Sequence, residues 1–459
     1  MRKGLVAQFP EPIPTFDLIL PTVRNWLQTH TGSLNDLLSN EDDWLLVNRD
    51  LNGRVRLILP ERFEESELCG RWDLLASRLM QCLGKHAYPQ KTEILFEANR
   101  EQALQGATSY LLDGFTKVWM VDRLATEANW ARIEAETENV SRVVFFSIKG
   151  GVGRSTALAA TAWRLAQDGK RVLVLDLDLE SPGLSSALLP SERQPMYGIT
   201  DWLIEDLVGN GDVVFESMVA TSNLSHDGEI HVVPAHGADH GEYIAKLGRV
   251  WMPKLNEDGT RETWSSRLSR LLQNLEERIQ PDVLLIDSRS GIDEIASACI
   301  TELGANLILL FSLEGEQTWN GYRMLFEQWQ RAGVAQQIRE RLQVVGAIVP
   351  ELDRVEYLAG LREHSYEVFV DTLYDEIAPI EVGEVDGAWR VGGLSEGWNF
   401  DEADETSPHH PWAVNWHRSF AGLLSLQGRL AAIDSQEVES VFGALINGVS
   451  NAVDGRDTA

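Results

Sequence analysis

The most constraining feature of this chain is a glycine-rich loop between a predicted strand and a predicted helix. The run VVFFSI, residues 143–148, leads directly into Lys149-Gly150-Gly151-Val152-Gly153-Arg154-Ser155-Thr156. A helix that ends at Gly169 follows, and one of its faces is formed by Leu158, Ala162 and Leu165. Glycines let backbone N–H groups converge on an anion, the helix start adds partial positive charge, and the Ser155 hydroxyl can reach a magnesium ion. The pattern therefore predicts a phosphate-binding loop (P-loop).

The sequence around this loop predicts a parallel sheet. From Val143 onward, short apolar runs alternate with amphipathic helices, as in sheets whose strands are joined by crossover helices. The segments predicted to be strands are Val143–Ser147, Val172–Asp176, Ile230–Pro234, Val283–Asp287, Leu307–Ser312 and Val344–Val349. The segment Trp264–Ile279 has an apolar stripe that we expect to pack on the sheet, formed by Leu268, Leu271, Leu272, Leu275 and Ile279. We expect an α/β fold with a doubly wound, mostly parallel sheet and helices on both faces.

The length of 459 residues exceeds what one hydrophobic core usually spans, so we expect two domains. Residues 1–126 are predicted to form a small α+β domain of unknown role, with a hairpin where WLLV and RVRLIL flank residues 48–53. Residues 127–142 are rich in acids and predict a solvated linker or a short exposed helix. Residues 143–352 hold the α/β domain, and residues 353–459 are either its C-terminal part or a helical appendage.

The loop KGGVGRST resembles the deviant phosphate loop, KGGxGK[ST], of ParA/MinD-type ATPases. The segments DLDLESPG and LLIDSRSG follow it in the order that this family has. The resemblance implies that the chain binds ATP and Mg²⁺ through residues 149–156 and forms an ATP-dependent homodimer, in which Lys149 reaches the phosphates of the partner subunit. Arg154 stands where the family commonly has a lysine, and a planar guanidinium does not reproduce a lysine point charge. We interpret Arg154 as a native phosphate ligand of a KGGVGR subgroup that carries DSR[ST]G, with slow hydrolysis.

The same resemblance implies roles for the acidic segments. Asp178 would orient the attacking water, so Lys149 and Asp178 are the predicted catalytic residues. Ser155, Asp176 and Asp287 would hold Mg²⁺, and Gly291 would offer its backbone N–H to the γ-phosphate. The alternative for Asp176 and Asp178 is that they only cap the turn that follows them.

The roles of two further positions are left open. Arg289 could sense phosphate or reach the partner subunit, and the alternative is a surface salt bridge. Pro350 stands where the family has an asparagine that reads adenine, and proline offers neither a polar side chain nor an N–H. No residue is therefore assigned to the base.

Charge and composition restrict the partners. The formal net charge of −30 opposes binding to polyanions, so we expect neither nonspecific DNA binding nor binding to anionic membranes. The stretch Ser435–Ala452 has an apolar helical face, but Arg456 is the only basic residue from position 435 to the end. We expect this helix to pack in the core or against a partner and not to anchor in lipid.

The cysteines and the N-terminal sequence indicate the cytoplasm. The chain has three cysteines without a CxxC pair, namely Cys69, Cys82 and Cys299, which supports neither a disulfide framework nor a zinc ribbon. We find no signal peptide and no membrane-spanning run. Two histidine groups could be imagined as metal sites, but no compact ligand spacing repeats, so we do not interpret them as such: His231, His236 and His240, and His409, His410 and His417. The family resemblance implies that the segment with the first group is a loop lining the dimer interface.

Three functions follow from these observations and stay open at this point. The first is an ATPase switch whose homodimer controls an unidentified protein partner. The second is an ATP-dependent phosphotransferase or ligase of the same superfamily. The third is a pseudo-ATPase that binds nucleotide only for assembly, with Arg154 as the reason.

Overall fold

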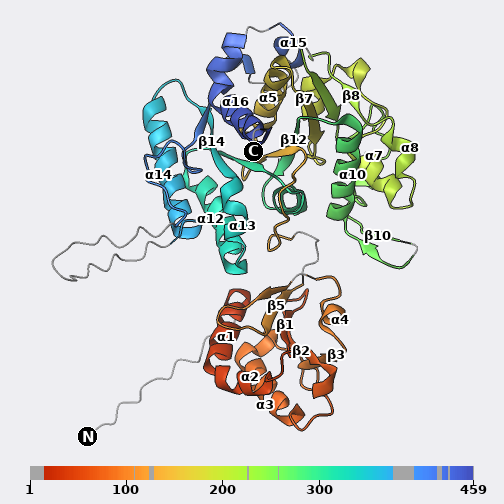
Figure 1. Ribbon diagram of the computed structural model, residues 1–459, viewed down its shortest axis with the longest axis vertical. Coiled ribbons are helices and arrows are strands. Elements are labelled where there is room, and N and C mark those ends of the chain that lie inside the picture. Colours follow the sequence, from red (N-terminus) through yellow and green to blue (C-terminus); the bar gives the residue numbers. More distant parts are fainter. Residues whose placement is uncertain are drawn as a thin grey trace, which may run out of the picture. The chain divides into compact units, whose positions relative to one another are not determined.

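A computed structural model of the chain describes residues 15–107, 109–123, 129–224, 227–256, 258–375, 397–420, 426–432 and 435–457 (Figure 1). The chain divides into two compact units, Met1–Thr126 and Glu127–Ala459. The first residues, on which the prediction of no signal peptide rests, lie outside the described residues, as does most of the glycine- and acid-rich stretch after position 375. In the described part of the chain, no helix is long and apolar enough to cross a membrane.

The N-terminal unit is built on a five-stranded mixed sheet with strand order β3-β2-β1-β5-β4. Its elements are α1 (Phe16–Thr29), α2 (Thr31–Leu37), β1 (Leu45–Arg49), β2 (Val55–Pro60), α3 (Cys69–Leu83), β3 (Ile94–Glu97), α4 (Arg100–Leu104), β4 (Ser109–Leu111) and β5 (Val118–Asp122). Residues of α1, α2 and α3 form the larger core on one face of the sheet. On the other face, α4 closes a much smaller apolar cluster.

The predicted hairpin is present in this unit as β1 and β2, which pair antiparallel with Leu46 opposite Ile58. Its turn begins later than expected, because Asn48 and Arg49 continue β1 and only Asp50 starts the turn. Asn48 is therefore a buried strand residue and not a turn residue.

The second unit contains an eight-stranded sheet with order β15-β14-β13-β6-β12-β7-β9-β8, in which only β8 is antiparallel to its neighbour. All six predicted strands are present in it. The strands are β6 (Ser141–Ser147), β7 (Arg171–Asp176), β8 (Ala220–Thr221), β9 (Glu229–Val233), β12 (Val283–Ser290), β13 (Leu307–Ser312), β14 (Leu342–Val349) and β15 (Trp412–Asn415), beside a small ribbon of β10 (Lys254–Leu255) and β11 (Arg261–Glu262). The edge strands β8 and β15 were not predicted, because each is too short to show a periodic pattern.

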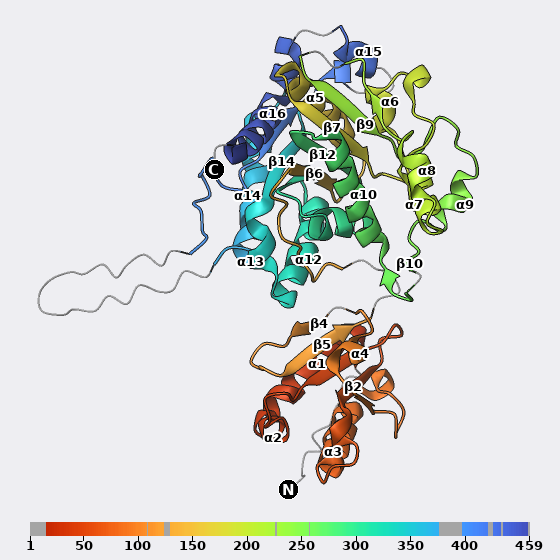
Figure 2. The same ribbon diagram turned by 45° about the vertical axis from the view of Figure 1, so that its right-hand side comes forward.

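Helices cover both faces of this sheet, as predicted (Figure 2). One face carries α7 (Ile199–Asp206), α10 (Trp264–Ile279), α11 (Glu294–Ser297), α12 (Glu316–Ala332) and α14 (Arg354–Thr372). The other carries α5 (Arg154–Gln167), α6 (Leu184–Leu188), α15 (Leu426–Leu430) and α16 (Ser435–Asp457). The described part of the unit also contains the short α-helices α8 (Gly211–Phe215), α9 (Tyr243–Leu247) and α13 (Ala335–Ile338). The stripe predicted within Trp264–Ile279 lies on the core side of α10, where its four leucines are buried.

Two segments differ from a simple domain-and-linker arrangement. The described part of the segment 127–142 is not a solvated linker: Glu134 N–H donates to the Thr301 carbonyl at 2.8 Å, and Trp130 and Ile133 pack on the core of the second unit. These apolar side chains outweigh the acidic pattern that suggested solvation. Residues after 352 also belong to the sheet unit, since β15 extends the sheet and α16 packs its apolar face against α5.

The close packing of α16 on β15 generates a stability prediction. A Cβ added to Gly448 would lie 2.5 Å from ring carbons of Trp412, whereas one added to Gly455 would meet open space. We expect Gly448→Ala to lower the free energy of unfolding by about 1–3 kcal/mol through overpacking, despite the better helix propensity of alanine. Gly455→Ala should be neutral or stabilising by up to about 1 kcal/mol. Urea unfolding of the full chain measures both, and equal effects of the two variants would contradict this account of the packing.

Candidate nucleotide site

The sheet topology brings the predicted motifs to one edge. In the sheet, β12 lies between β6 and β7, and all three strands are parallel. Their carboxyl ends therefore meet, which places the loop after β6 next to Asp176 at the end of β7 and Asp287 on β12. After β6 the chain first adds β7 and β9 on one side of β6 and later adds β13 and β14 on the other side, so the direction of strand addition reverses at β6. Ligands of open α/β sheets bind at such a reversal.

The loop itself has the geometry of an anion cradle. Gly151 and Gly153 adopt φ of 75° and 78°, a left-handed conformation that favours glycine. The backbone N–H groups of residues 150–156 donate no hydrogen bond to any other described residue. Free N–H groups at the start of α5 carry partial positive charge and can converge on phosphate oxygens. The donor set fits a nucleotide phosphate group.

Beneath the loop, Arg154 forms a buried ion pair with Asp287. The Arg154 Nε donates to Asp287 Oδ1 at 2.6 Å, and its two terminal nitrogens lie 3.0 Å from Ser147 Oγ and 3.5 Å from Asp178 Oδ2. Both partners of the ion pair are buried, with 7% and 1% of their side chains exposed. Burial alone would lower the pKa of Arg154, but the attraction and hydrogen bond of Asp287 outweigh it and raise that pKa. Ser155 Oγ donates to the other oxygen of Asp287 at 2.5 Å.

Two more carboxylates complete this cluster. Asp176 is fully buried, and burial, followed by repulsion from Asp287 and Asp178, raises its pKa to about 7. Burial also raises the pKa of Asp178, although attraction by Arg154 opposes that shift. Asp176 accepts backbone N–H groups of Asp178 and Gly183, both at 3.3 Å. Asp178 accepts the N–H of Ser181 through Oδ1, while its Oδ2 faces Arg154. Both acids thus act as turn acceptors here, as the alternative interpretation predicts, and one oxygen of Asp178 stays directed to the cluster.

Comparison with known proteins decides the family. The model of the CobQ/CobB/MinD/ParA nucleotide binding domain matches residues 143–454. The chain belongs to this family. The match includes the loop, both acidic segments and the C-terminal helices, so the resemblance to ParA/MinD-type ATPases that the motifs suggested is confirmed.

The individual proteins that match the chain share either a short stretch or a low sequence identity with it. A stretch of 53 residues is 43% identical to a protein named putative arsenical pump-driving ATPase 1 from Aquifex aeolicus, and it spans 12% of this chain and 13% of that protein. The MinD cell division protein of Aquifex aeolicus is 16% identical over 68% of this chain and 98% of its own, with a TM-score of 0.40. A cobyrinic acid a,c-diamide synthase from Mycobacterium smegmatis, solved with an ATP analog and magnesium, is 20% identical over 52% of this chain and 87% of its own, with a TM-score of 0.32.

Other motif residues of this family member are already engaged in contacts. Gly291, at φ of 100°, donates its N–H to the carbonyl of Ser147 at 2.9 Å, so that N–H would have to be released before it could reach a phosphate. Arg289 pairs with Glu180 at 2.7 Å and with Asp293 at 3.1 Å. These partly exposed pairs match the surface salt bridge that was one of its two interpretations. Lys149 is the first residue of the loop, and its Nζ donates to Gln317 Oε1 at 3.1 Å in an exposed contact.

Sequence reasoning missed one residue that contacts this cluster and one that contacts the segment beside it. Ser147, the last residue of β6, is buried and accepts from Arg154 as well as from Gly291 through its carbonyl. Tyr243, on α9, donates to the carbonyl of Leu179 at 2.6 Å and so ties α9 to the segment after β7. Neither residue belongs to a motif. The position of Ser147 directly before the loop is the one signal that could have indicated its role, and Tyr243 carries no such signal.

The backbone is irregular at the end of β14, where the resemblance led us to expect a base-reading residue. Ile348, next to the end of β14, has φ of 50°, which is rare for a β-branched residue, and the pairing with β15 shifts register between Gly346 and Val349. Pro350 follows this distortion. The end of β14 therefore combines an irregular backbone with a proline that has no N–H to offer.

The histidine groups do not gather into a metal site in the described structure. His236 and His240 contact each other at 3.1 Å between their Nδ1 atoms, and His231 lies beside Glu229. His409 is buried against Tyr374. Within the described ranges, no group of three or more His, Cys, Asp and Glu side chains is placed to hold a metal ion. A Mg²⁺ held by one hydroxyl, phosphates and water needs no such group.

The buried ion pair under the loop generates the second prediction. Arg154→Ala leaves the Asp287 carboxylate buried without its cation, so we expect the nucleotide-free chain to lose about 3–5 kcal/mol of unfolding free energy. Arg154→Lys keeps the charge and should lose less. The matched control is Arg289→Ala, whose partly exposed pairs contribute about 0–1 kcal/mol. Chemical denaturation of the three variants measures the difference, and a loss for Arg154→Ala no larger than for Arg289→Ala would contradict the assigned role of the ion pair.

Proposed function

We propose that this chain is an ATPase switch that binds ATP and Mg²⁺, dimerises around them and controls a protein partner. The observation that carries the proposal is the loop of residues 149–156: the N–H groups of residues 150–156 are free to bind phosphate, and the side chain of Ser155 pairs with Asp287. Family membership supports the nucleotide-binding part of the proposal. The slow or regulated step would be hydrolysis, because the arginine in the loop is already held by carboxylates.

The residues of the cluster would divide the work of binding. The loop N–H groups would hold the phosphates, and Ser155 would turn its hydroxyl oxygen from Asp287 toward the metal. Asp287 and Asp176 would orient the water around the ion from the ends of adjacent strands. Bound Mg²⁺ would supply positive charge that stabilises the negative charge of the reacting phosphates. The guanidinium of Arg154 would then leave Asp287 and donate to a phosphate oxygen instead.

Dimerisation would depend on Lys149. Its only hydrogen bond to a described residue is the exposed contact with Gln317 on α12, which costs little to break. A free ammonium at the loop entrance can contact a phosphate in a facing subunit, as the KGGxGK pattern implies. ATP would thereby bring two copies together, and hydrolysis would release them.

The dimer prediction is tested by the mass in solution. The wild type should double its mass by light scattering with a non-hydrolysable ATP analogue and Mg²⁺ but not with ADP, and Lys149→Ala should stay monomeric in both. Lys170→Ala is the matched control, because Lys170 precedes β7 at the opposite edge of the sheet, where it pairs with Asp454. An unchanged mass of the wild type in every nucleotide state would refute ATP-dependent dimerisation.

Hydrolysis is tested at Asp178. If its carboxylate positions the attacking water, Asp178→Ala should retain analogue binding while steady-state turnover falls by about 10²-fold or more. Asp168→Ala, at an exposed acid beyond α5 that pairs with Arg164, should leave turnover unchanged. Wild-type turnover that survives in Asp178→Ala would remove this residue from the mechanism.

A second candidate function is a pseudo-ATPase that uses nucleotide only for assembly. The observation that favours it is the orientation of Arg154, which donates to Asp287 beneath the loop and leaves fewer of its donors for phosphate. The turnover experiment separates the two. Nucleotide-dependent dimerisation without any wild-type turnover would support assembly alone.

The proposed partner is a protein, since a net charge of −30 opposes nonspecific nucleic acid and anionic lipid. The helix α16, which could have served as an attachment site, has its apolar face buried against α5 and β15. That burial withdraws the face from partner binding.

A further inference from the structure

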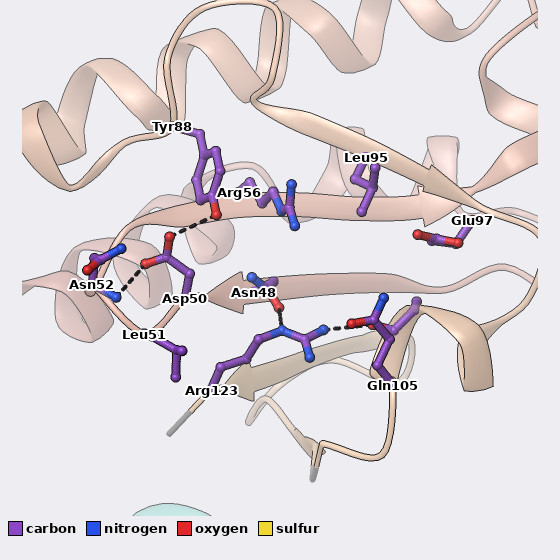
Figure 3. A pocket seen from close by; sticks show the side chains of 11 residues that line it. Asn48, Asp50, Leu51, Asn52, Arg56, Tyr88, Leu95, Glu97, Gln105 and Arg123 are labelled. Carbon is purple, nitrogen blue, oxygen red and sulfur yellow. Dashed lines mark hydrogen bonds between the residues drawn. The ribbon is translucent and has the colours of Figure 1, made fainter. Parts of the chain in front are cut away.

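The N-terminal unit contains a polar cavity of about 290 Å³ that no motif of the sequence predicted (Figure 3). Its floor consists of residues from three adjacent strands or strand ends: Asn48 from β1, Arg56 from β2 and Arg123 directly after β5. Tyr88 and Asp50 form one side of it, and Gln105 follows α4 on another.

The cavity follows from how this face of the sheet is covered. Asn48 and Arg56 are direct cross-strand partners and lie two residues from the pair Leu46 and Ile58, so all four side chains share one face. The leucine and isoleucine pack under α4. Because α4 has only five residues, its apolar cluster ends at Leu46 and Ile58 and does not extend to the fully buried Asn48 or the partly exposed Arg56. The polar end of the face remains open.

This open end is rich in hydrogen-bond donors. Asn48 is fully buried and accepts from Arg123 Nε at 2.7 Å, while its Nδ2 has no hydrogen-bond partner among the described residues. The buried Nε of Arg56 likewise has no partner there, and its guanidinium lies 4.7 Å from the ring centre of Tyr88. Arg123 also donates to the carbonyls of Leu104 and Ala103, which fixes its guanidinium in place. Buried donors without acceptors are costly unless a ligand or water satisfies them.

The charges of the cavity point the same way. Arg56 and Arg123 form no ion pair with any described carboxylate, and burial followed by repulsion from Arg56 lowers the pKa of Arg123. Of the two carboxylates that line the cavity, Asp50 already accepts from Tyr88 Oη at 2.8 Å and from backbone N–H groups of Asn52 and Arg54. Glu97 lies near the end of β3 and forms no ion pair with a described residue. Two positive charges are thus close together and not neutralised by direct pairing.

We propose that this cavity is a binding site for a small ligand that carries an oxyanion, held by Arg56 and Arg123 with Asn48 as a further donor. A guanidinium presents parallel N–H groups that match the oxygens of a carboxylate or a phosphate. The volume lies at the lower end of the range of small-molecule sites, so the ligand is a compact metabolite and not a macromolecule. The site belongs to the N-terminal unit alone and adds a ligand that is distinct from the nucleotide.

The proposal is tested by calorimetric titration of the full chain with two probes, inorganic phosphate and succinate, at constant ionic strength. The phosphate loop is first saturated with a non-hydrolysable ATP analogue and Mg²⁺, so that added phosphate cannot bind there. We expect saturable binding of at least one probe, and the probe that binds identifies a phosphate or a carboxylate ligand. Arg56→Gln should weaken this binding by about tenfold or more, since a charged hydrogen bond contributes roughly 1.5–3 kcal/mol.

Arg54→Gln is the matched control, because it removes the same charge from the same hairpin at an exposed residue that does not line the cavity. Its affinity should equal that of the wild type. Arg123→Gln should also abolish binding, and circular dichroism shows whether that variant keeps its fold. The proposal is wrong if neither probe binds saturably, if Arg56→Gln binds as the wild type does, or if Arg54→Gln weakens binding equally. None of these outcomes depends on hydrolysis or dimerisation, so they test the cavity separately from the switch.

Discussion

The buried pair of Arg154 and Asp287 is the interaction on which the nucleotide site depends. It joins the first residue of α5 to the carboxyl end of β12 at 2.6 Å, and Ser155 reinforces the junction from the next position. A guanidinium can bind Asp287 and Ser147 at the same time, which a lysine ammonium on one flexible stem does less well. The arginine therefore ties the loop, the helix and two strands into one rigid group, while it occupies donors that a lysine would present to phosphate.

The parallel sheet gives this pair its surroundings. Because β6, β12 and β7 are neighbours with the same direction, Asp176 and Asp178 from one part of the sequence gather with Asp287 from another at one edge. Burial, followed by repulsion among the acids, raises the pKa of Asp176 to about 7, and a single buried arginine offsets only part of this negative charge. Such a cluster is electrostatically prepared for a cation, which is consistent with the magnesium proposed for this family member.

The cavity of the N-terminal unit is rich in hydrogen-bond donors, whereas the cluster at the loop is rich in negative charge. In the N-terminal unit, two arginines and a buried asparagine line the cavity, and Asp50, one of its two lining carboxylates, is held by a tyrosine and by backbone groups. The apolar cluster under the short helix α4 does not extend to this polar end of the sheet. One chain thus combines an acidic site at the carboxyl edge of a parallel sheet with a donor-rich cavity on the face of a mixed sheet.

The sequence by itself determined the strands, the loop and the order of the motifs, because these depend on local patterns. The six buried strands and the helix Trp264–Ile279 have periodicities that few other conformations satisfy, and the glycines of the loop require their backbone geometry. Only the tertiary structure decided which side chains meet. It directed Arg154 to Asp287, bound the N–H of Gly291 to Ser147, packed Trp130 on the core and placed Asn48 and Arg56 beside a cavity. These outcomes depend on distances between residues far apart in the chain and on the competition between burial and pairing, which no local pattern records.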